Sequence, residues 1–264
     1  MVPFLKWAGG KRWLFTSEFI ASLPKFDRYV EPFLGGGAGF FALEPKSSLL
    51  SDVNPELINL YEVVRDYPDR IEELLAFHQS KHSKDHFYTV RKLVPDNKIA
   101  CAARMLYLNR TCWNGLYRLN MKGEFNVPIG TKTSVLLPSD NFIRASDLLK
   151  EADLNICDFQ ATIDSSKEGD LLFVDPPYTV AHNMNGFVKY NEKIFTWDDQ
   201  LRLRSSLAAA HSRGACVILS NANHASISEL YANLGEHLEV SRHSVISGTS
   251  DARGRTTELL VRLQ

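Results

Sequence analysis

The chain has 264 residues, of which 44% are hydrophobic and 23% charged, and its formal net charge is −1. These values predict a globular protein with a sizeable core, built as one large domain or as one domain with an insertion. No apolar run is long enough to span a membrane, and residues 1–11 lack the charged start and apolar core of a signal peptide. We therefore expect a cytoplasmic protein with no membrane partner.

The cysteines and histidines do not indicate a metal site. The four cysteines show no CxxC spacing and lie in apolar segments, which predicts reduced core thiols. They are Cys101, Cys112, Cys157 and Cys216. His78, His82 and His86 recur at helical spacing, but no acid or cysteine completes a ligand set. Because Ser83 also breaks the helix between them, a solvated face is the favoured interpretation, and we expect no metal.

The charges are distributed unevenly along the chain. Residues 104–132 hold five basic residues against one acid, a local charge of +4, whereas residues 44–73 hold eight acids against three basic residues, a local charge of −5. A neutral total with one basic segment is compatible with a single phosphate-facing surface. A solvated basic loop is the alternative that this pattern leaves open.

The first glycine-rich turn lies at residues 4–11. It places a Gly-Gly pair between Trp7 and Lys11, and a helix is predicted from Arg12 to Leu23. The glycines permit close approach of the backbone, and Lys11 at the helix start could hold an anionic group such as a carboxylate. A purely structural turn explains these residues equally well.

The second glycine-rich segment follows a strand that begins near Arg28. It runs from Gly35 to Gly39 and leads into a helix, an arrangement that lets a ligand lie against bare backbone at a helix N-terminus. The GxGxxG spacing of dinucleotide-binding loops fails because Phe40 stands in place of the last glycine. The loop therefore favours a different adenosyl ligand, of which S-adenosylmethionine is the commonest in this fold class.

A second strand, predicted at residues 48–51, ends at Asp52. Asn54 and Pro55 then cap a helix. An acid at the end of the second strand is placed to accept hydrogen bonds from both ribose hydroxyls of an adenosyl ligand. Helix capping is the alternative role, but the glycine loop one strand earlier favours the ligand.

Residues 55–111 carry a helical pattern with no strand signal. Helices are predicted at residues 56–67, 69–80, 85–92 and 97–109. This is too much helix for a single crossover of a βαβ fold, so we predict an inserted helical domain. The predicted insertion covers residues 56–145, and the predicted catalytic domain covers residues 1–55 and 146–264.

Residues 111–128 have the pattern of a two-stranded hairpin. The strands flank an Asn-Met-Lys-Gly turn at residues 120–123, and Pro128 ends the second strand. Two-stranded ribbons fit the DNA major groove, and Arg118 could form a bidentate hydrogen bond with a guanine edge. A plain surface hairpin is the alternative.

The remaining chain is predicted to return to the sheet. Helices are expected at residues 139–150 and 196–212, and strands at residues 154–157, 216–220, 238–245 and 257–263. Asp158 could receive the adenine amine of a cofactor and Phe159 could cover its ring; a turn acid and a core phenylalanine are the alternatives. Residues 178–195 are predicted as a mobile loop over a site, and residues 247–255 as a basic loop that could meet phosphate.

The strongest functional signal lies where a buried strand at residues 171–174 ends. Asp175, Pro176, Pro177 and Tyr178 follow it, and the prolines prevent the strand from continuing. Asp175 is thereby held at the carboxyl edge of a sheet, where open α/β folds bind ligands. Its carboxylate and the Pro176 carbonyl are two acceptors that match an amine with two hydrogens, and Tyr178 offers a face for a planar base. An ordinary strand-to-loop turn is the alternative.

Seven segments can be compared with a known family. They are FLKWAGGK at residues 4–11, EPFLGGGAGFF at 31–41, SDVN at 51–54, NRTCWNGLYRLNMKGEFNVPIG at 109–130, DPPY at 175–178, SNANH at 220–224 and SGTSDARGRTTELL at 247–260. In this order they closely resemble the DNA adenine methyltransferases of the Dam type, alpha group. The resemblance implies an α/β, class I S-adenosylmethionine-dependent methyltransferase sheet with an inserted helical target-recognition domain carrying a β-hairpin.

The resemblance also implies candidate site residues. Those that would bind S-adenosylmethionine are Trp7, Lys11, Phe33, Gly35, Gly37, Asp52, Asp158, Phe159 and Asp175. Those that would contact double-stranded DNA are Lys6, Trp113, Asn114, Leu116, Arg118 and Pro128. In GATC-methylating members, Lys6 matches a lysine that reads the first guanine, and the hairpin residues match positions that read later bases. Trp113 matches an aromatic wedge beside the flipped base, and Asn114 a residue that fills the vacated space.

These expectations combine into one reaction. The predicted enzyme flips an adenine out of duplex DNA, within GATC, stacks it on Tyr178 and holds its amine with Asp175 and the Pro176 carbonyl for methylation. Two alternatives remain at this point. One is a methyltransferase that acts on a protein glutamine, and the other is an inactive DNA-binding protein of the same fold.

Overall fold

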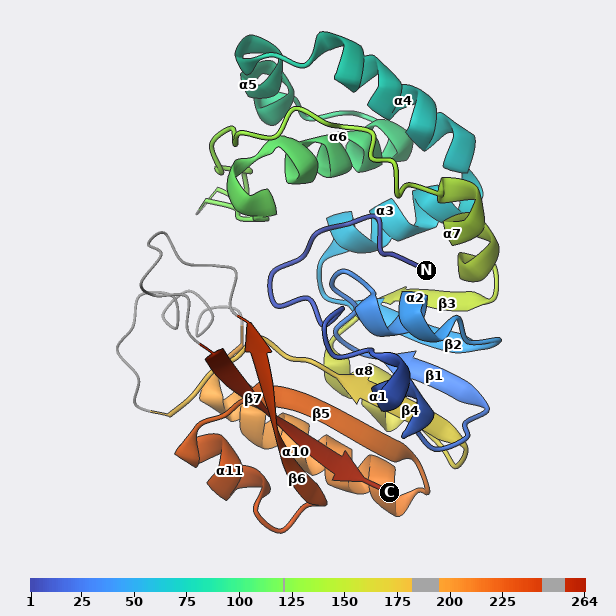
Figure 1. Cartoon of the computed structure of the whole chain (residues 1–264), viewed down its shortest axis with the longest axis vertical. Coiled ribbons are helices and arrows are strands. Elements are labelled where there is room, and N and C mark those ends of the chain that lie inside the picture. The colour runs from blue at the N-terminus through green and yellow to red at the C-terminus, as the bar shows by residue number, and fades with distance from the viewer. Residues whose placement is uncertain (121, 182–194, 244–254) are drawn as a thin grey trace. The chain divides into compact units, whose positions relative to one another are not determined.

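The computed structural model describes residues 1–120, 122–181, 195–243 and 255–264 (Figure 1). The chain folds into two compact units. The first unit comprises Met1–Phe15, Leu34–Lys46 and Leu50–Ile156, and the second comprises Thr16–Phe33, Ser47–Leu49 and Cys157–Gln264. Residues 182–194 of the predicted mobile loop and residues 247–254 of the predicted basic loop lie outside the described residues.

The described strands form a seven-stranded sheet in the order β3-β2-β1-β4-β5-β7-β6. The strands are β1 (Arg28–Glu31), β2 (Ser48–Asp52), β3 (Ala152–Ile156), β4 (Asp170–Val174), β5 (Cys216–Ala222), β6 (Glu236–His243) and β7 (Arg255–Leu263). β4 pairs in parallel with β1 and with β5, whereas β7 runs antiparallel to both β5 and β6. This mixed sheet confirms the predicted α/β class and the class I methyltransferase sheet.

β4 lies between β1 and β5, and all its residues are buried. A continuous apolar run of this kind is typical of a parallel strand covered on both faces. At its start, the buried carboxylate of Asp170 accepts hydrogen bonds from Arg28 Nε at 3.0 Å and from its Nη2 at 2.6 Å. At its end, Pro176 and Pro177 prevent further ladder pairing. The predicted strand is therefore confirmed, with a paired charge at one end and the prolines at the other.

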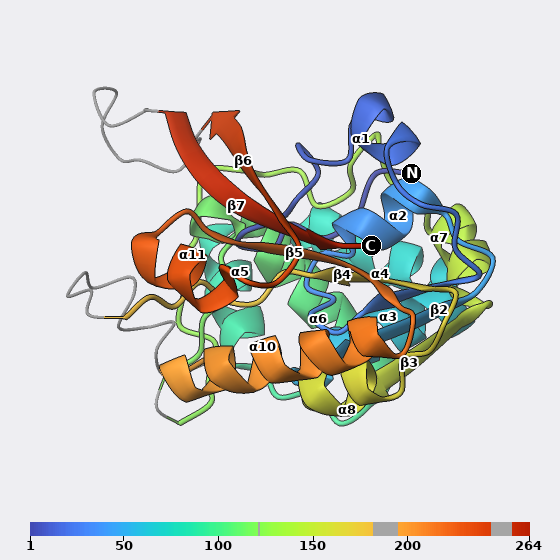
Figure 2. The same cartoon turned by 90° about the horizontal axis from the view of Figure 1, so that it is seen from below.

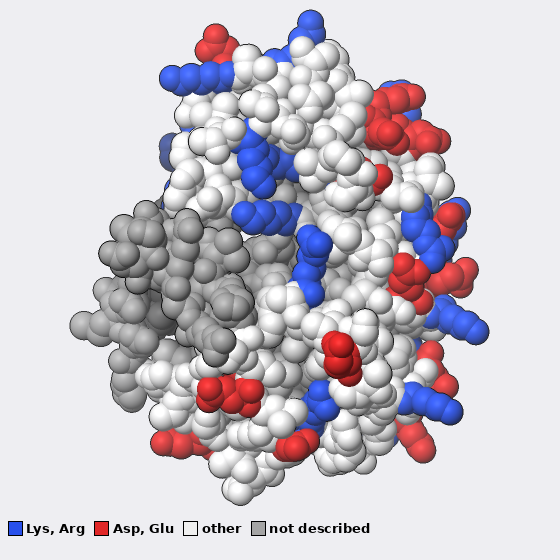
Figure 3. Space-filling model, viewed as in Figure 1, with Lys and Arg blue, Asp and Glu red and all other residues white. Residues whose placement is uncertain are grey.

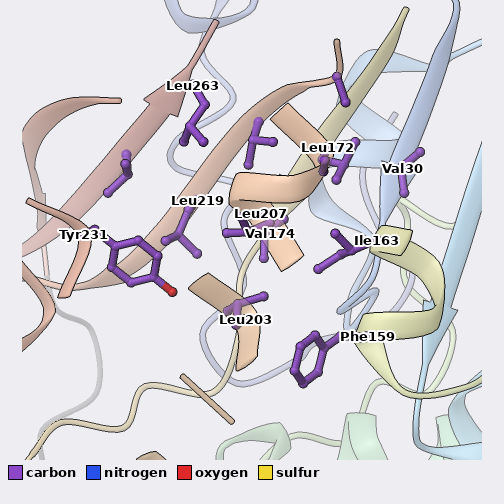
Figure 4. Close-up of a cluster of buried hydrophobic side chains, with 14 of the residues drawn as sticks. Val30, Phe159, Ile163, Leu172, Val174, Leu203, Leu207, Leu219, Tyr231 and Leu263 are labelled. Carbon is purple, nitrogen blue, oxygen red and sulfur yellow. The ribbon is translucent and has the colours of Figure 1, made fainter. Parts of the chain in front are cut away.

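The core of the second unit lies between its strands and its helices. Figure 2 shows α8 (Phe159–Asp164) and α10 (Trp197–Ser212) side by side on one face of the strands. Figure 4 shows the side chains that meet there, among them Val30, Leu172, Val174 and Leu219 from the strands, Ile163 from α8, and Leu203 and Leu207 from α10. The predicted N-terminal cap of α10 is present as a capping box between Thr196 and Asp199. α11 (Ala225–Tyr231) packs against α10.

The first unit is mainly helical. Its helices are α2 (Ala38–Leu43), α3 (Pro55–Asp66), α4 (Pro68–Lys81), α5 (Lys84–Lys92), α6 (Lys98–Thr111) and α7 (Phe142–Leu149). α6 is buried along its C-terminal two-thirds and contacts α3, α4 and α5. These contacts confirm the four helices predicted between residues 56 and 109. No helix of the described ranges is long and apolar enough to cross a membrane.

The structure corrects some local predictions. The helix predicted from Arg12 begins only at α1 (Ser17–Ala21), because Thr16 accepts a hydrogen bond from Phe19 N and caps it there. α8 and α11 were not predicted. The helix predicted from residue 139 begins at α7, where Asn141 supplies the cap.

The histidine interpretation needs a correction as well. Ser83 does separate α4 from α5, as predicted, and its side chain caps α5. The prediction of a solvated face was wrong for His78, which is buried and stacks on Tyr107 with 4.6 Å between ring centroids. His78 Nδ1 lies 3.0 Å from His86 Nε2. The four cysteines are free, as predicted.

Candidate functional site

In the second unit, Asp175 stands directly after β4 and is partly buried, and Pro176 is buried. Two tyrosines lie near the carboxylate. Burial raises the pKa of Tyr29, on β1, well above its usual value, and Glu31 and Asp175 raise it further. Burial likewise raises the pKa of Tyr178, with further contributions from Asp175 and Glu258. The strand therefore ends in an acid flanked by two neutral phenols.

The hydroxyl of Tyr178 is held by two buried side chains. It donates a hydrogen bond to Glu258 Oε2 at 2.8 Å and lies 2.9 Å from Ser220 Oγ. Ser220 belongs to β5 and Glu258 to β7, and the exposed fractions of these two residues are 0% and 3%. The polar end of the tyrosine is thus anchored in the core, and its partly buried ring is fixed from that end.

The chain after Tyr178 is anchored too. Thr179 Oγ1 donates to the carbonyl of Phe195 at 2.6 Å, which joins the two ends of the segment between them. Gln200 Nε2, from α10, donates to the carbonyl of Thr179 at 3.3 Å, and its own Oε1 accepts from Asn221 Nδ2 of β5. The backbone on the C-terminal side of the DPPY segment is therefore fixed by buried polar side chains.

Three predicted cofactor residues of the second unit lie close together. Phe33 and Phe159 stack with 5.3 Å between ring centroids, and Phe195 packs against both. Asp158 caps α8 by accepting from Gln160 N, and its carboxylate pairs with Arg202 at 3.1 Å. The Arg202 guanidinium also lies 4.7 Å from the centroid of Phe159. Asp158 thus caps a helix beside the aromatic pair, a role that was not predicted from the sequence.

In the first unit, Trp7 packs directly on the glycine loop. A Cβ atom at Gly35, whose φ is +47°, would lie 2.7 Å from Trp7 Cδ1. A Cβ at Gly37, whose φ is +64°, would lie 2.9 Å from the hydroxyl of Tyr61, which itself donates to the Gly35 carbonyl at 3.0 Å. Both the backbone conformation and the close approach require glycine at these positions. The loop is held between Trp7 on one side and Tyr61 on the other.

Asp52, at the end of β2, binds the same loop. Its Oδ2 accepts from Gly35 N at 3.1 Å and its Oδ1 from Asn54 N at 3.0 Å. Burial raises the pKa of the carboxyl, although these backbone N–H groups oppose the shift. Each carboxylate oxygen keeps a further acceptor site in this arrangement, so the group could also accept from hydroxyls. Lys11 is buried, and its Nζ donates to the Gly9 carbonyl at 2.6 Å.

A short turn follows α6 and carries the predicted wedge. It is a single 3-10 turn at Trp113–Gly115, in which Asn114 has a left-handed φ of 55° and Trp113 is 52% exposed. The buried side chain of Asn109 joins this turn to Lys6. Its Nδ2 donates to the carbonyls of Lys6 and Gly115 at 2.7 and 3.1 Å, and its Oδ1 accepts from Lys6 N at 3.2 Å.

The predicted hairpin is less regular than the sequence indicated. Between residues 111 and 130, the described residues form isolated bridges, Cys112 with Ile129 and Leu119 with Phe125, but no extended strand. The two ends of this segment still meet, since Trp113 N donates to the Pro128 carbonyl at 2.9 Å. Arg118 and Pro128 are exposed and Leu116 is half-buried. These side chains are therefore presented on an irregular ribbon.

Basic side chains gather near this ribbon. Burial lowers the pKa of the Lys6 amine, and the positive charge of Lys132 lowers it further, which shows that the two amines are neighbours. Arg118 is held by a hydrogen bond from its Nε to Asn126 Oδ1 at 2.8 Å. In Figure 3, Lys and Arg side chains gather over α6 and the segment that follows it, whereas the acidic side chains in that view lie elsewhere. This surface could meet phosphate.

The model of the D12 class N6 adenine-specific DNA methyltransferase family matches residues 7–246. The chain belongs to this family. It is 35% identical over 269 residues to a type II methyltransferase of Lactococcus lactis subsp. cremoris, covering 98% of this chain and 94% of the relative. It is 37% identical over 243 residues to a type II methyltransferase of Methanocaldococcus jannaschii, covering 83% of each. A DNA adenine methylase of Vibrio cholerae is 31% identical over 263 residues, covering 97% of this chain and 94% of the relative.

The protein is thus an adenine-specific DNA methyltransferase. Family membership favours adenine over a protein glutamine as the methyl acceptor, and an enzyme over an inactive DNA-binding protein. Among the residues that the structure describes, no group of three His, Cys, Asp or Glu side chains could hold a metal ion.

Within each unit of the methyltransferase, the structure relates the predicted residues to partners that the sequence did not reveal. Trp7, Gly35 and Asp52 lie together in the first unit, as do Lys6 and Gly115. Two partners were missed. They are Asn109, which holds Lys6, and Glu258, which holds Tyr178. The only sequence signal for each was its position in a segment shared with the family.

Proposed function

We propose that this methyltransferase methylates the exocyclic amine of an adenine that is flipped out of double-stranded DNA, with S-adenosylmethionine as the methyl donor. The observation that carries the proposal is the end of β4, where Asp175 is followed by a buried Pro176 and by a tyrosine anchored at its hydroxyl. The enzyme would act on DNA in the cytoplasm.

Asp175 and Pro176 supply the acceptors that the amine needs. The lone pair of an exocyclic amine is delocalised into the ring, so the nitrogen is a weak nucleophile. A carboxylate oxygen and the Pro176 carbonyl would each accept one amine hydrogen and draw the nitrogen toward tetrahedral geometry. Tyr178 would stack on the flipped base.

The predicted cofactor residues would bind the methyl donor, which supplies an electrophilic methyl group when bound. The glycine loop fits an adenosyl ligand because it is bare backbone that a Cβ would fill, and Asp52 fits its ribose hydroxyls. Phe33 and Phe159 would cover the adenine ring and Asp158 would accept its amine. Trp7, Lys11, Gly35, Gly37 and Asp175 complete the proposed set. Lys11 would pair with the carboxylate of the methionine part.

The proposed DNA contacts lie in the first unit, and we propose that residues 56–145 form the inserted target-recognition domain. Lys6 would read the first guanine of GATC, and Leu116, Arg118 and Pro128 the later bases. Trp113, 52% exposed, would wedge into the stack, and Asn114 would fill the space left by the flipped adenine. The cost of flipping is a few kcal/mol, which the wedge and the stacking on Tyr178 would offset.

The test is methylation of unmodified duplex DNA by the purified protein with S-adenosylmethionine, followed by methylation-sensitive digestion and sequencing of the modified positions. Methyladenine within GATC is the expected product. Methyladenine at another sequence would overturn GATC specificity alone, whereas modified cytosine would overturn the choice of base. Fluorescence of 2-aminopurine at the target position should rise on binding if the base is flipped, and an unchanged signal would contradict flipping.

A further inference from the structure

Glu258 is a buried acid whose carboxylate contacts Tyr178 and Ser220. It lies on β7 opposite Ala222 of β5, and its exposed fraction is 3%. Its Oε2 accepts from the Tyr178 hydroxyl at 2.8 Å and from Ser220 Oγ at 3.3 Å. A buried carboxylate is costly unless such donors compensate it. The arrangement therefore holds an acceptor in the core at a defined place beside one tyrosine.

The proton of this hydrogen bond resides on the tyrosine. Burial raises the pKa of Tyr178 well above its usual value, and the negative charges of Asp175 and Glu258 raise it further. The phenol is therefore neutral at physiological pH and donates to the carboxylate, which makes a strong, charge-assisted hydrogen bond. Ser220, within 2.9 Å of the same hydroxyl, adds a second contact from another strand.

These contacts restrict the ring at its far end. A tyrosine ring is positioned by two side-chain torsions, and here the backbone on both sides is also restricted, by Pro177 before it and by the anchored Thr179 after it. A hydroxyl fixed to β5 and β7 then leaves the ring plane little freedom to swing. A reaction on a stacked base depends on the position of the ring beneath it, because a misplacement of the reacting groups by about 1 Å can lower the rate a hundredfold.

We propose that Glu258 is a positioning residue of the methyltransferase, which fixes the plane of the Tyr178 ring on which the flipped adenine stacks. The proposal rests on the proposed function of Tyr178 as the stacking face. It assigns Glu258 no contact with DNA, with the methyl donor or with the reacting amine.

The first test compares Glu258→Ala with Glu258→Gln. The alanine variant should lower kcat about 10- to 100-fold with less than about a threefold change in KM for DNA, since ring placement and not DNA contact is lost. The glutamine variant keeps an acceptor oxygen and should restore most of kcat. Asp170→Ala is a matched control, because it removes another buried carboxylate of the same unit, paired with Arg28, and should lower thermal stability with kcat retained below the unfolding temperature.

A double-mutant cycle with Tyr178→Phe shows whether Glu258 acts through the tyrosine hydroxyl. Tyr178→Phe keeps the ring but loses the contact, so Glu258→Ala should lower kcat by less than about twofold further in that background. A wild-type kcat in Glu258→Ala, or full additivity of the two changes, would overturn the proposal.

A second readout does not depend on methylation. With 3-fluorotyrosine at position 178, the fluorine resonance should be single and sharp in the wild type and should shift or broaden in Glu258→Ala but not in Asp170→Ala. An identical resonance in all three proteins would overturn the positioning role. If the wild type methylates no adenine, the proposed function fails, but this resonance still decides whether Glu258 orders the ring.

Discussion

The end of β4 and the turn after α6 carry the two halves of the proposed activity, and they are built differently. Asp175 to Tyr178 follow a fully buried strand, and buried side chains of β5, β7 and α10 hold the residues at their C-terminal side. The described residues between 113 and 128 form no extended strand and present exposed side chains, including Trp113 and Arg118. The proposed chemistry lies on a rigid edge, whereas the proposed DNA contacts lie on an irregular ribbon.

This difference shows how the residues at the end of β4 and those of the ribbon are held in position. The tyrosine of the strand edge is fixed by contacts made at its own side-chain tip. At the base of the ribbon, Asn109 joins Lys6 to Gly115, and the neighbouring Arg110 forms a buried ion pair with Asp140 at 2.6 Å. Farther along, Tyr117 donates to Glu56 at 3.0 Å. A rigid edge suits a reaction with one geometry. A ribbon held at its base can adapt its exposed part to the groove it reads.

The largest effect is expected at the rigid edge. Asp175→Ala removes the carboxylate that would accept an amine hydrogen, and kcat should fall by about a thousandfold or more. Because Asp175 is partly exposed, the thermal unfolding temperature should change little. Asp164→Ala, which removes an exposed acid of α8 in the same unit, is the control and should leave activity unchanged. Activity of Asp175→Ala near that of the wild type would refute its catalytic role.

The rigid edge was also the part that the sequence predicted best. An apolar run that stops at two prolines defines a buried strand and its end through local rules alone. The glycine loop at Gly35 and Gly37 was likewise found through a local pattern, a run of glycines between a strand and a helix. Features of this kind need no knowledge of distant residues.

Contacts between residues far apart in sequence could not be predicted in this way. Glu258 binds a tyrosine 80 positions earlier, and Asn109 binds Lys6 across 103 positions. In sequence the first is a polar residue in a predicted strand and the second a polar residue near a helix end. The helix predicted from Arg12 failed for a different reason, since the pattern continued through Thr16 although that residue caps the helix.

An intermediate effect is expected on the exposed part of the ribbon. Arg118→Ala should weaken binding of the target duplex by about 10- to 100-fold, as expected when a bidentate contact with a base is lost, and should relax discrimination at one base pair. The methylation rate at saturating DNA should change much less. Arg144→Ala, which removes an exposed charge paired with Glu44, is the control for lost charge. Equal weakening on all sequences would assign Arg118 to a phosphate instead.

A smaller effect is expected at the base of the ribbon. Asn109→Ala removes the side chain that bonds Lys6 and Gly115, so both should move independently. We expect the ratio of kcat/KM between the preferred site and sites with one changed base pair to fall by about three- to tenfold. Asn59→Ala, which removes a side-chain bond to the Lys98 carbonyl in the same unit, should leave this ratio unchanged. An unchanged ratio in Asn109→Ala would show that the ribbon does not depend on its base.

Substitution of His78, the buried histidine of the first unit, should have the smallest effect on activity. Its effect on stability should be selective. Burial and the neighbouring His86 lower the pKa of His78 to about 4, against an ordinary value near 6.5. The unfolded chain therefore binds more protons between these values, so the free energy of unfolding should decrease as pH falls from about 6.5 to about 4. His78→Phe should keep the stacking on Tyr107 and weaken this dependence, to which His82 and His86 also contribute because burial lowers their pKa as well. Hydrogen exchange of α4 and α5 measured across this range would report the loss locally, and the same pH dependence in both proteins would assign it to another group.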